Sequence, residues 1–114
     1  MQRRERIALK KICSEINIIL EFLGEKTLED FLNDELLKRA VGMTAINIGE
    51  LTKHLSFEMR KNYPDVAWSS AAKFRDVVAH KYETLNMTTV YDTVTKDFPE
   101  LKKQIEKILE AEEK

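Results

Sequence analysis

Apolar positions recur at spacings of three and four residues along most of the chain, which is typical of amphipathic helices. The first such stripe predicts a helix over residues 2–23, which Gly24 would end as a C-terminal cap. Thr27, followed closely by two acidic residues, predicts the start of a short helix. Asp34 gives the same signal for a long helix, which we expect to run to about Arg60.

The second half of the chain shows the same period after a break at Pro64, because proline disfavours helix at the residue before it. Residues 66–80 are predicted to form a helix whose start is anchored by Trp68, with residues 81–86 as a connection.

Two further helices complete the pattern. We expect Thr88 or Thr89 to cap a helix that runs to about Lys96, and Asp97 to cap the last one. The charged tail, residues 110–114, is expected to fray. The pattern therefore predicts an all-α fold, an up-down antiparallel helical bundle.

Two glycines interrupt the long second helix. Gly42 and Gly49 each cost about 1 kcal/mol of helix propensity relative to alanine. We interpret them as places where a neighbouring helix packs closely.

Composition narrows the functional classes. The 114 residues fit a single domain over 1–114. The net charge of -1 gives no bulk attraction to nucleic acid, so RNA binding would need a local patch. Cys13 is the one cysteine and predicts a reduced, cytoplasmic setting. No apolar run approaches ~20 residues, so we expect no membrane span. No zinc-ligand spacing or phosphate loop stands out, so no metal or cofactor is expected.

The segment from Arg75 to Tyr82 carries the candidate chemistry. On a helix, Arg75 and His80 lie about 140° apart around the axis and do not share a face. Asp76 and His80 are four residues apart and do share one. Asp76 is therefore expected to accept a hydrogen bond from one ring nitrogen of His80, leaving the other free to exchange a proton. Tyr82 would lie just past the helix end.

An arginine, a histidine and a tyrosine suggest phosphodiester chemistry by proton transfer. The 2′-hydroxyl of RNA would attack its own phosphate, with His80 as base or acid and Arg75 holding the developing charge. Two copies of the helix in a symmetric dimer would bring two such sets into one cleft. On spacing alone, a surface ion pair and a helix-end histidine near the dipole are the more common outcome.

Other polar residues are expected to have structural rather than catalytic roles. His54 is expected to be solvated or packed between helices, and Cys13 to belong to the core rather than act as a nucleophile. Glu50 would pair with Arg75 or with a lysine as structural support.

The order Arg75, four residues, His80, one residue, Tyr82 resembles the signature of the HEPN superfamily, specifically the HepT-like toxins of HEPN/MNT toxin–antitoxin systems. Asp76 occupies the place of the polar residue that typically follows the arginine. The similarity extends in order over nearly the whole chain, through Ile48-Gly49-Glu50 in the long helix, Trp68 before the motif helix, and Asp97-Phe98-Pro99-Glu100-Leu101 at the last helix.

The resemblance implies a HEPN-like homodimer with the motif helices at a shared cleft. It implies metal-independent cleavage of RNA, with Arg75 and His80 catalytic and Asp76 and Tyr82 supporting. The partner would be a nucleotidyltransferase antitoxin of the MNT type in a type II system. In some such systems the antitoxin transfers AMP from ATP to the motif tyrosine, here Tyr82 as O-AMP-tyrosine, and the added phosphate would mask the cleft.

Two other functions stay open on the sequence. The chain could be a non-catalytic HEPN module that binds nucleotide or a nucleotidyltransferase partner, or a structural helical bundle. RNA cleavage that persists in EDTA and is lost in His80→Ala separates the nuclease from both.

Overall fold

The computed structural model describes residues 1–113 and is all-α over them. A 3₁₀ turn at Tyr82–Thr84 follows the fifth helix, and a π-helical segment at Thr93–Asp97 joins the last two. The helices are α1 (Arg3–Leu23), α2 (Leu28–Leu32), α3 (Glu35–Lys53), α4 (Phe57–Asn62), α5 (Trp68–Lys81), α6 (Met87–Asp92) and α7 (Phe98–Glu112).

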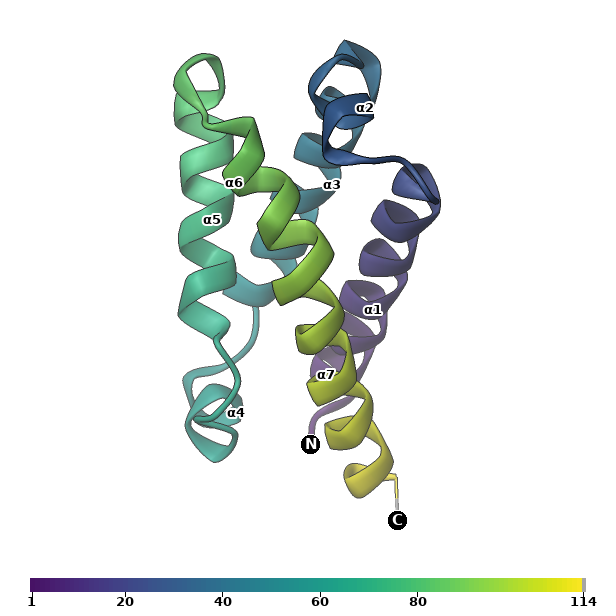
Figure 1. The fold of residues 1–114 in the computed structure, drawn as a ribbon. Helices are drawn as coiled ribbons and strands as arrows, with labels where there is room; N and C mark the ends of the chain where they lie inside the picture. Colours follow the sequence, from purple (N-terminus) through teal and green to yellow (C-terminus); the bar gives the residue numbers. More distant parts are fainter. Residues whose placement is uncertain (114) are drawn as a thin grey trace.

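The long helices alternate in direction, as an up-down antiparallel bundle requires. In Figure 1, α1 rises from the N-terminus, α3 descends behind, α5 rises, and α6 with α7 descends across the front. The bundle measures 44 × 28 × 21 Å. α3 packs against both α1 and α5. The side chains of α3 therefore determine which residues of α1 and α5 it contacts.

The predicted apolar stripes form the core. On α1, the residues Leu9, Ile12, Ile16 and Ile19 are fully buried at spacings of three and four. Burying one such side chain contributes about 1.5–3 kcal/mol, so the stripes hold the bundle together. The other helices contribute Phe31, Val41, Ala45, Ile48, Val78, Val90, Val94, Phe98, Leu101 and Ile105.

Several predicted helix ends are confirmed. Gly24 adopts a φ of 50°, and its N–H donates to the Leu20 carbonyl, which ends α1. Thr27 and Asp30 form a reciprocal capping box at α2. Asp34 caps α3 through its carboxylate. These helix ends depend on residues within about one turn, which explains why the sequence alone predicts them.

The prediction of one helix over residues 34–60 is wrong, because α3 ends at Lys53 and a separate α4 follows. Ser56 starts α4, where its Oγ accepts a hydrogen bond from the Met59 N–H at 3.0 Å. The buried carboxylate of Glu5 accepts from the Ser56 N–H at 3.1 Å and from its Oγ at 2.7 Å. The break thus depends on a residue of α1 that is distant in the sequence.

Of two cap assignments in the second half, one is wrong, and the other is right in position but lacks the capping hydrogen bond. Asn86, rather than Thr88 or Thr89, caps α6, where its Oδ1 accepts from both threonine N–H groups at 3.0 and 3.3 Å. Asp97 has helical backbone angles and makes no cap bond, because the π-helical segment keeps the chain helical into α7.

The C-terminal tail is more ordered than predicted. Residues 110–112 are helical, and the Glu112 Oε1 accepts a hydrogen bond from the Tyr63 hydroxyl at 2.6 Å. Tyr63 also receives the Trp68 Nε1–H on its carbonyl at 3.0 Å, which confirms Trp68 as the anchor of α5. Lys114 lies outside the described residues. None of the described helices combines the length and the apolarity needed to cross a bilayer.

Candidate functional site

The contact between α3 and α5 is the frame of the candidate site. A Cβ atom added at Gly49 would lie 2.0 Å from the Cβ of Arg75, which no real pair of side chains tolerates. One added at Gly42 would lie 3.3 Å from the Cε1 of Tyr82. The two glycines therefore let α5 approach α3 closely, as predicted, and they do so at two residues of the motif.

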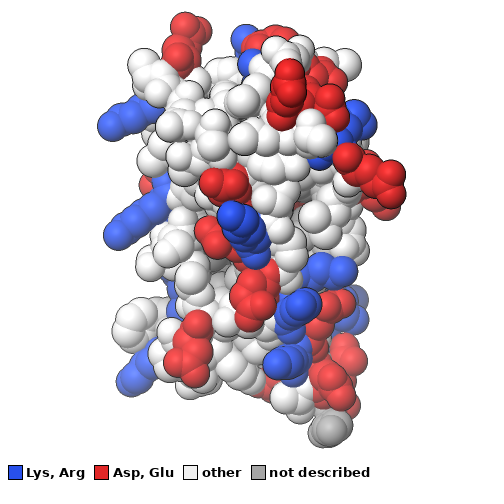
Figure 2. Space-filling model, viewed as in Figure 1, with Lys and Arg blue, Asp and Glu red and all other residues white. Residues whose placement is uncertain are grey.

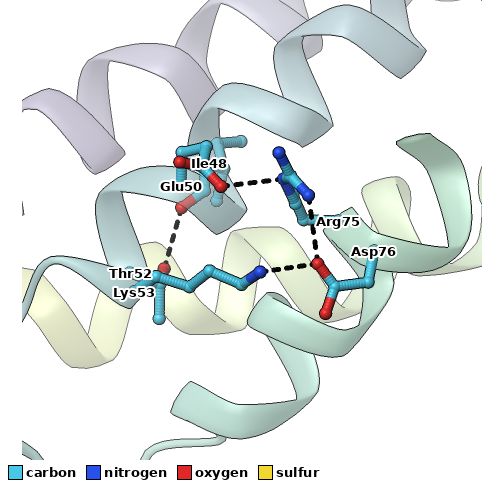
Figure 3. Close-up of polar contacts among 6 residues, drawn as sticks. All are labelled: Ile48, Glu50, Thr52, Lys53, Arg75 and Asp76. Carbon is cyan, nitrogen blue, oxygen red and sulfur yellow. Dashed lines mark hydrogen bonds and ion pairs between the residues drawn. The ribbon is translucent and has the colours of Figure 1, made fainter. Parts of the chain in front are cut away.

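Arg75 lies inside a cluster of four charged side chains, with Glu50 and Lys53 from α3 and Asp76 from α5 (Figure 3). Its Nη1 donates to the Asp76 Oδ1 at 3.1 Å, and Lys53 Nζ donates to the same oxygen at 2.6 Å. Its Nε lies 2.9 Å from the Glu50 Oε1. That contact is an ion pair and lacks the geometry of a hydrogen bond. The predicted pairing of Glu50 with Arg75 is confirmed.

The cluster lies at the surface, but its arginine is more buried than its two carboxylates. The Arg75 side chain is 22% exposed, against 46% for Asp76 and 43% for Glu50. The hydrogen bond from Lys53, followed by that from Arg75, lowers the pKa of Asp76 below its ordinary value. Asp76 is therefore a fixed negative charge at neutral pH that ties two cations of different helices together.

The predicted hydrogen bond between Asp76 and His80 is not formed, and this prediction is corrected. The Asp76 carboxylate turns to Lys53 of α3 instead, a neighbour that only the packing of the helices supplies. Within residues 1–113, His80 makes no hydrogen bond or ion pair, and it is exposed at the end of α5. Arg75 faces α3, so one copy of the chain does not bring the two groups into contact.

Tyr82 follows α5 in the 3₁₀ turn and folds back on α3. Its ring lies against Gly42, and the Cζ of Arg39 lies 5.1 Å from the ring centroid, within range of a cation–π contact. Its hydroxyl oxygen is buried and has no hydrogen-bond partner among the described residues. Any reaction at this oxygen requires the side chain to turn outward.

Sequence reasoning missed Lys53. The signal was present, because Lys53 lies three residues after Glu50 and so shares its helix face. Among residues 1–113, no group of three or more His, Cys, Asp or Glu side chains is placed to hold a metal ion. A cavity of about 480 Å³ between α5 and α7 contains none of the predicted site residues.

An all-α up-down bundle whose third long helix carries an arginine and a histidine, with a tyrosine just after its end, defines a helical domain of the HEPN superfamily. The chain belongs to the family described as ribonuclease HepT-like, whose model matches residues 12–108. The resemblance to HepT-like HEPN proteins is thereby confirmed.

Curated relatives share much of the chain. A protein of Thermococcus cleftensis named probable ribonuclease HepT is 32% identical over 108 residues, which cover 95% of this chain and 98% of the relative. A provisionally named RNase of Caldanaerobacter subterraneus subsp. tengcongensis is 35% identical over 104 residues, 91% of this chain and 93% of the relative.

A third relative is larger. A protein of Methanocaldococcus jannaschii, named a gamma-glutamylcyclotransferase and provisional RNase, is 34% identical over all 114 residues of this chain. The chain spans only about half of that relative, 51% of its length. No solved structure matches the chain significantly.

Proposed function

We propose that the chain is a ribonuclease toxin of a type II HEPN/MNT toxin–antitoxin system, with Arg75 and His80 as the catalytic residues. The observation that carries this proposal is the Arg75 guanidinium, which is fixed between α3 and α5 yet 22% exposed, with an exposed His80 on the same helix. The ribonuclease names of the relatives support it.

The reaction needs only proton transfer and charge stabilisation. The ribose 2′-oxygen attacks the neighbouring phosphorus and loses its proton to a base, and the 5′-oxygen leaves and takes a proton from an acid. Imidazole suits both roles near neutral pH. The planar guanidinium of Arg75 would hold two phosphate oxygens as their charge grows.

The site requires a second copy. Arg75 and His80 lie about 140° apart on α5 and do not meet within one chain. In a homodimer with the two α5 helices facing each other, the histidine of one copy approaches the arginine of the other. Two imidazoles then divide the acid and base roles between them.

Neutralisation by a nucleotidyltransferase antitoxin is part of the same proposal. The Tyr82 oxygen would attack the α-phosphorus of ATP, lose its proton and form O-AMP-tyrosine as pyrophosphate leaves. The ring must first turn away from Gly42, because its hydroxyl is buried. The product places a negative phosphate beside the cleft, which repels RNA. Tyr82→Phe should keep the fold, since the hydroxyl makes no hydrogen bond within the described residues, and should abolish labelling by the antitoxin with ATP.

The test uses purified protein and single-stranded RNA in EDTA. Cleavage should persist in the chelator and fall by at least about a hundredfold in Arg75→Ala and in His80→Ala. Lys73→Ala is the matched control, because Lys73 is an exposed cation of the same helix and forms no ion pair within residues 1–113. Equal activity in all three variants would refute the assignment.

The second candidate is a non-catalytic module that binds nucleotide or a nucleotidyltransferase partner. It is favoured by the charge balance at Arg75, which two carboxylates neutralise, and by the lack of a carboxylate bonded to His80 within the described residues. An intact partner complex without any RNA cleavage supports this alternative.

A further inference from the structure

A second concave surface lies directly beside the Arg75 cluster. It is a cavity of about 440 Å³ between α1 and α3, within the range of small-ligand sites. Glu50 belongs to both features, since it lines the cavity and pairs with Arg75. The cavity and the cluster therefore share a side chain of α3. The lining residues are Lys11, Ser14, Glu15, Asn47, Glu50, Leu51 and His54.

The lining combines the groups that a nucleotide needs. Lys11 offers a cation for a phosphate, and Leu51 with the His54 imidazole offers an apolar and planar surface for a base. Asn47 Nδ2 donates to the Glu15 Oε1 at 3.1 Å, which fixes the amide and leaves its carbonyl oxygen to accept from a base edge.

Lys53 links the two features. Its Nζ bonds Asp76 within the Arg75 cluster, and its neighbour His54 lines the cavity. An RNA chain that places one phosphate at Arg75 would have Lys53 beside it, and Lys11 supplies the cation of the cavity.

Other faces are less suitable. On the face shown in Figure 2, acidic and basic side chains are mixed over α7, and acidic side chains gather at the upper right over α2. The cavity of about 480 Å³ between α5 and α7 is rimmed by Asp65, Asp97 and Glu100, and no lysine or arginine lines it to bind a phosphate. The cavity between α1 and α3 also has two carboxylates, but Glu15 accepts a hydrogen bond from Asn47 and Glu50 pairs with Arg75, and Lys11 supplies a cation.

We propose that the cavity between α1 and α3 binds the nucleotide next to the one held at Arg75, with Lys11 on its phosphate and Asn47 on its base. The proposal rests on the proposed function, because it takes single-stranded RNA as the ligand. It adds a binding subsite between α1 and α3 to a reaction centred on α5.

The test compares two neighbouring lysines. Lys11→Gln removes the cation that lines the cavity, whereas Lys10→Gln removes the same charge about 100° around α1, where it pairs with Glu113 at 3.5 Å. Both variants are made in a His80→Ala background to prevent cleavage. Binding of a fluorescent single-stranded RNA of mixed sequence is followed by anisotropy between 50 and 200 mM salt, and folding is checked by circular dichroism.

Loss of one phosphate contact lowers the salt slope by about 0.7, so Lys11→Gln should reduce the affinity lost over this fourfold salt range by about threefold. Lys10→Gln should keep the slope of the parent. Asn47→Ala should leave the slope unchanged and alter the relative affinities for oligo-A and oligo-U. Equal slopes for the two lysine variants would overturn the subsite.

The outcome separates the two proposals. A Lys11-specific loss of binding in a chain with no RNA cleavage upholds the subsite and refutes the nuclease. Cleavage that depends on Arg75 and His80, with no difference between Lys10→Gln and Lys11→Gln, upholds the nuclease and refutes the subsite.

Discussion

Replacing Gly49 by alanine tests the helix contact on which the site depends. The new Cβ would meet Arg75 Cβ at 2.0 Å, Arg75 Cγ at 2.7 Å and the Ala71 carbonyl oxygen at 3.1 Å. These atoms belong to the backbone or lie next to it, so they cannot swing aside as the end of a long side chain does. α5 must therefore move away from α3.

The cost follows from two opposing terms. Overpacking a tight contact costs about 1–3 kcal/mol. The upper end applies because the new Cβ clashes with atoms that cannot move aside. Alanine regains about 1 kcal/mol of helix propensity, which leaves a net loss of about 2 kcal/mol. A chain of 114 residues has an unfolding entropy of about 0.24 kcal/mol/K, so Tm should fall by about 8 °C.

Gly42→Ala is the matched control in the same helix. Its Cβ would meet the Tyr82 ring at 3.3 Å and a methyl of Val78 at 3.6 Å, both of which can shift slightly. The propensity gain is the same, so the variant should lie within about 1 kcal/mol of the parent. Thermal and urea unfolding followed by circular dichroism measure both. A Gly49→Ala protein as stable as Gly42→Ala would refute the close approach of α3 and α5.

Three further predictions concern groups away from the motif. Glu5→Ala strips the buried acceptor from Ser56 and should cost about 1–3 kcal/mol in urea unfolding. Burial raises the pKa of the Cys13 thiol to about 11 from a reference of 9.0, so a thiol reagent at pH 8 should react about a hundredfold more slowly than in urea. The Tyr63 hydroxyl lowers the pKa of Glu112, so Tyr63→Phe should lower Tm at pH 7 and have little effect at about pH 2.

The pH dependence follows from the direction of the shift. A carboxyl with a lowered pKa in the folded state stabilises the fold above its ordinary pKa, and that stability is lost as the pH falls through the lowered value. An equal Tm change for Tyr63→Phe at both pH values would contradict this account. Glu25→Ala serves as the control for Glu5→Ala, because Glu25 is an exposed carboxyl. Equal thiol reactivity of the native and urea-unfolded chains would rule out the burial of Cys13.

The helical frame was predictable because its signals are local. These signals depend on residues within one or two turns of each other. They are the apolar stripe on α1, Gly24 with its positive φ, and the capping box at Thr27. The break before Ser56 was missed because it depends partly on Glu5, which is more than 50 positions away along the chain. The continuous helix through Asp97 was missed because Pro99, two residues later, resembles a proline in the first turn of a new helix.

At the site, the sequence by itself determined which groups are available: Arg75 and His80 on one helix, and Tyr82 just past its end. Only the tertiary structure decided their neighbours. Asp76 was four residues from His80 and was expected to bond it, yet the crossing of α3 and α5 at Gly49 brings Lys53 to its carboxylate first. Helix periodicity states which way a side chain points, whereas the identity of its partner depends on how closely two helices pack.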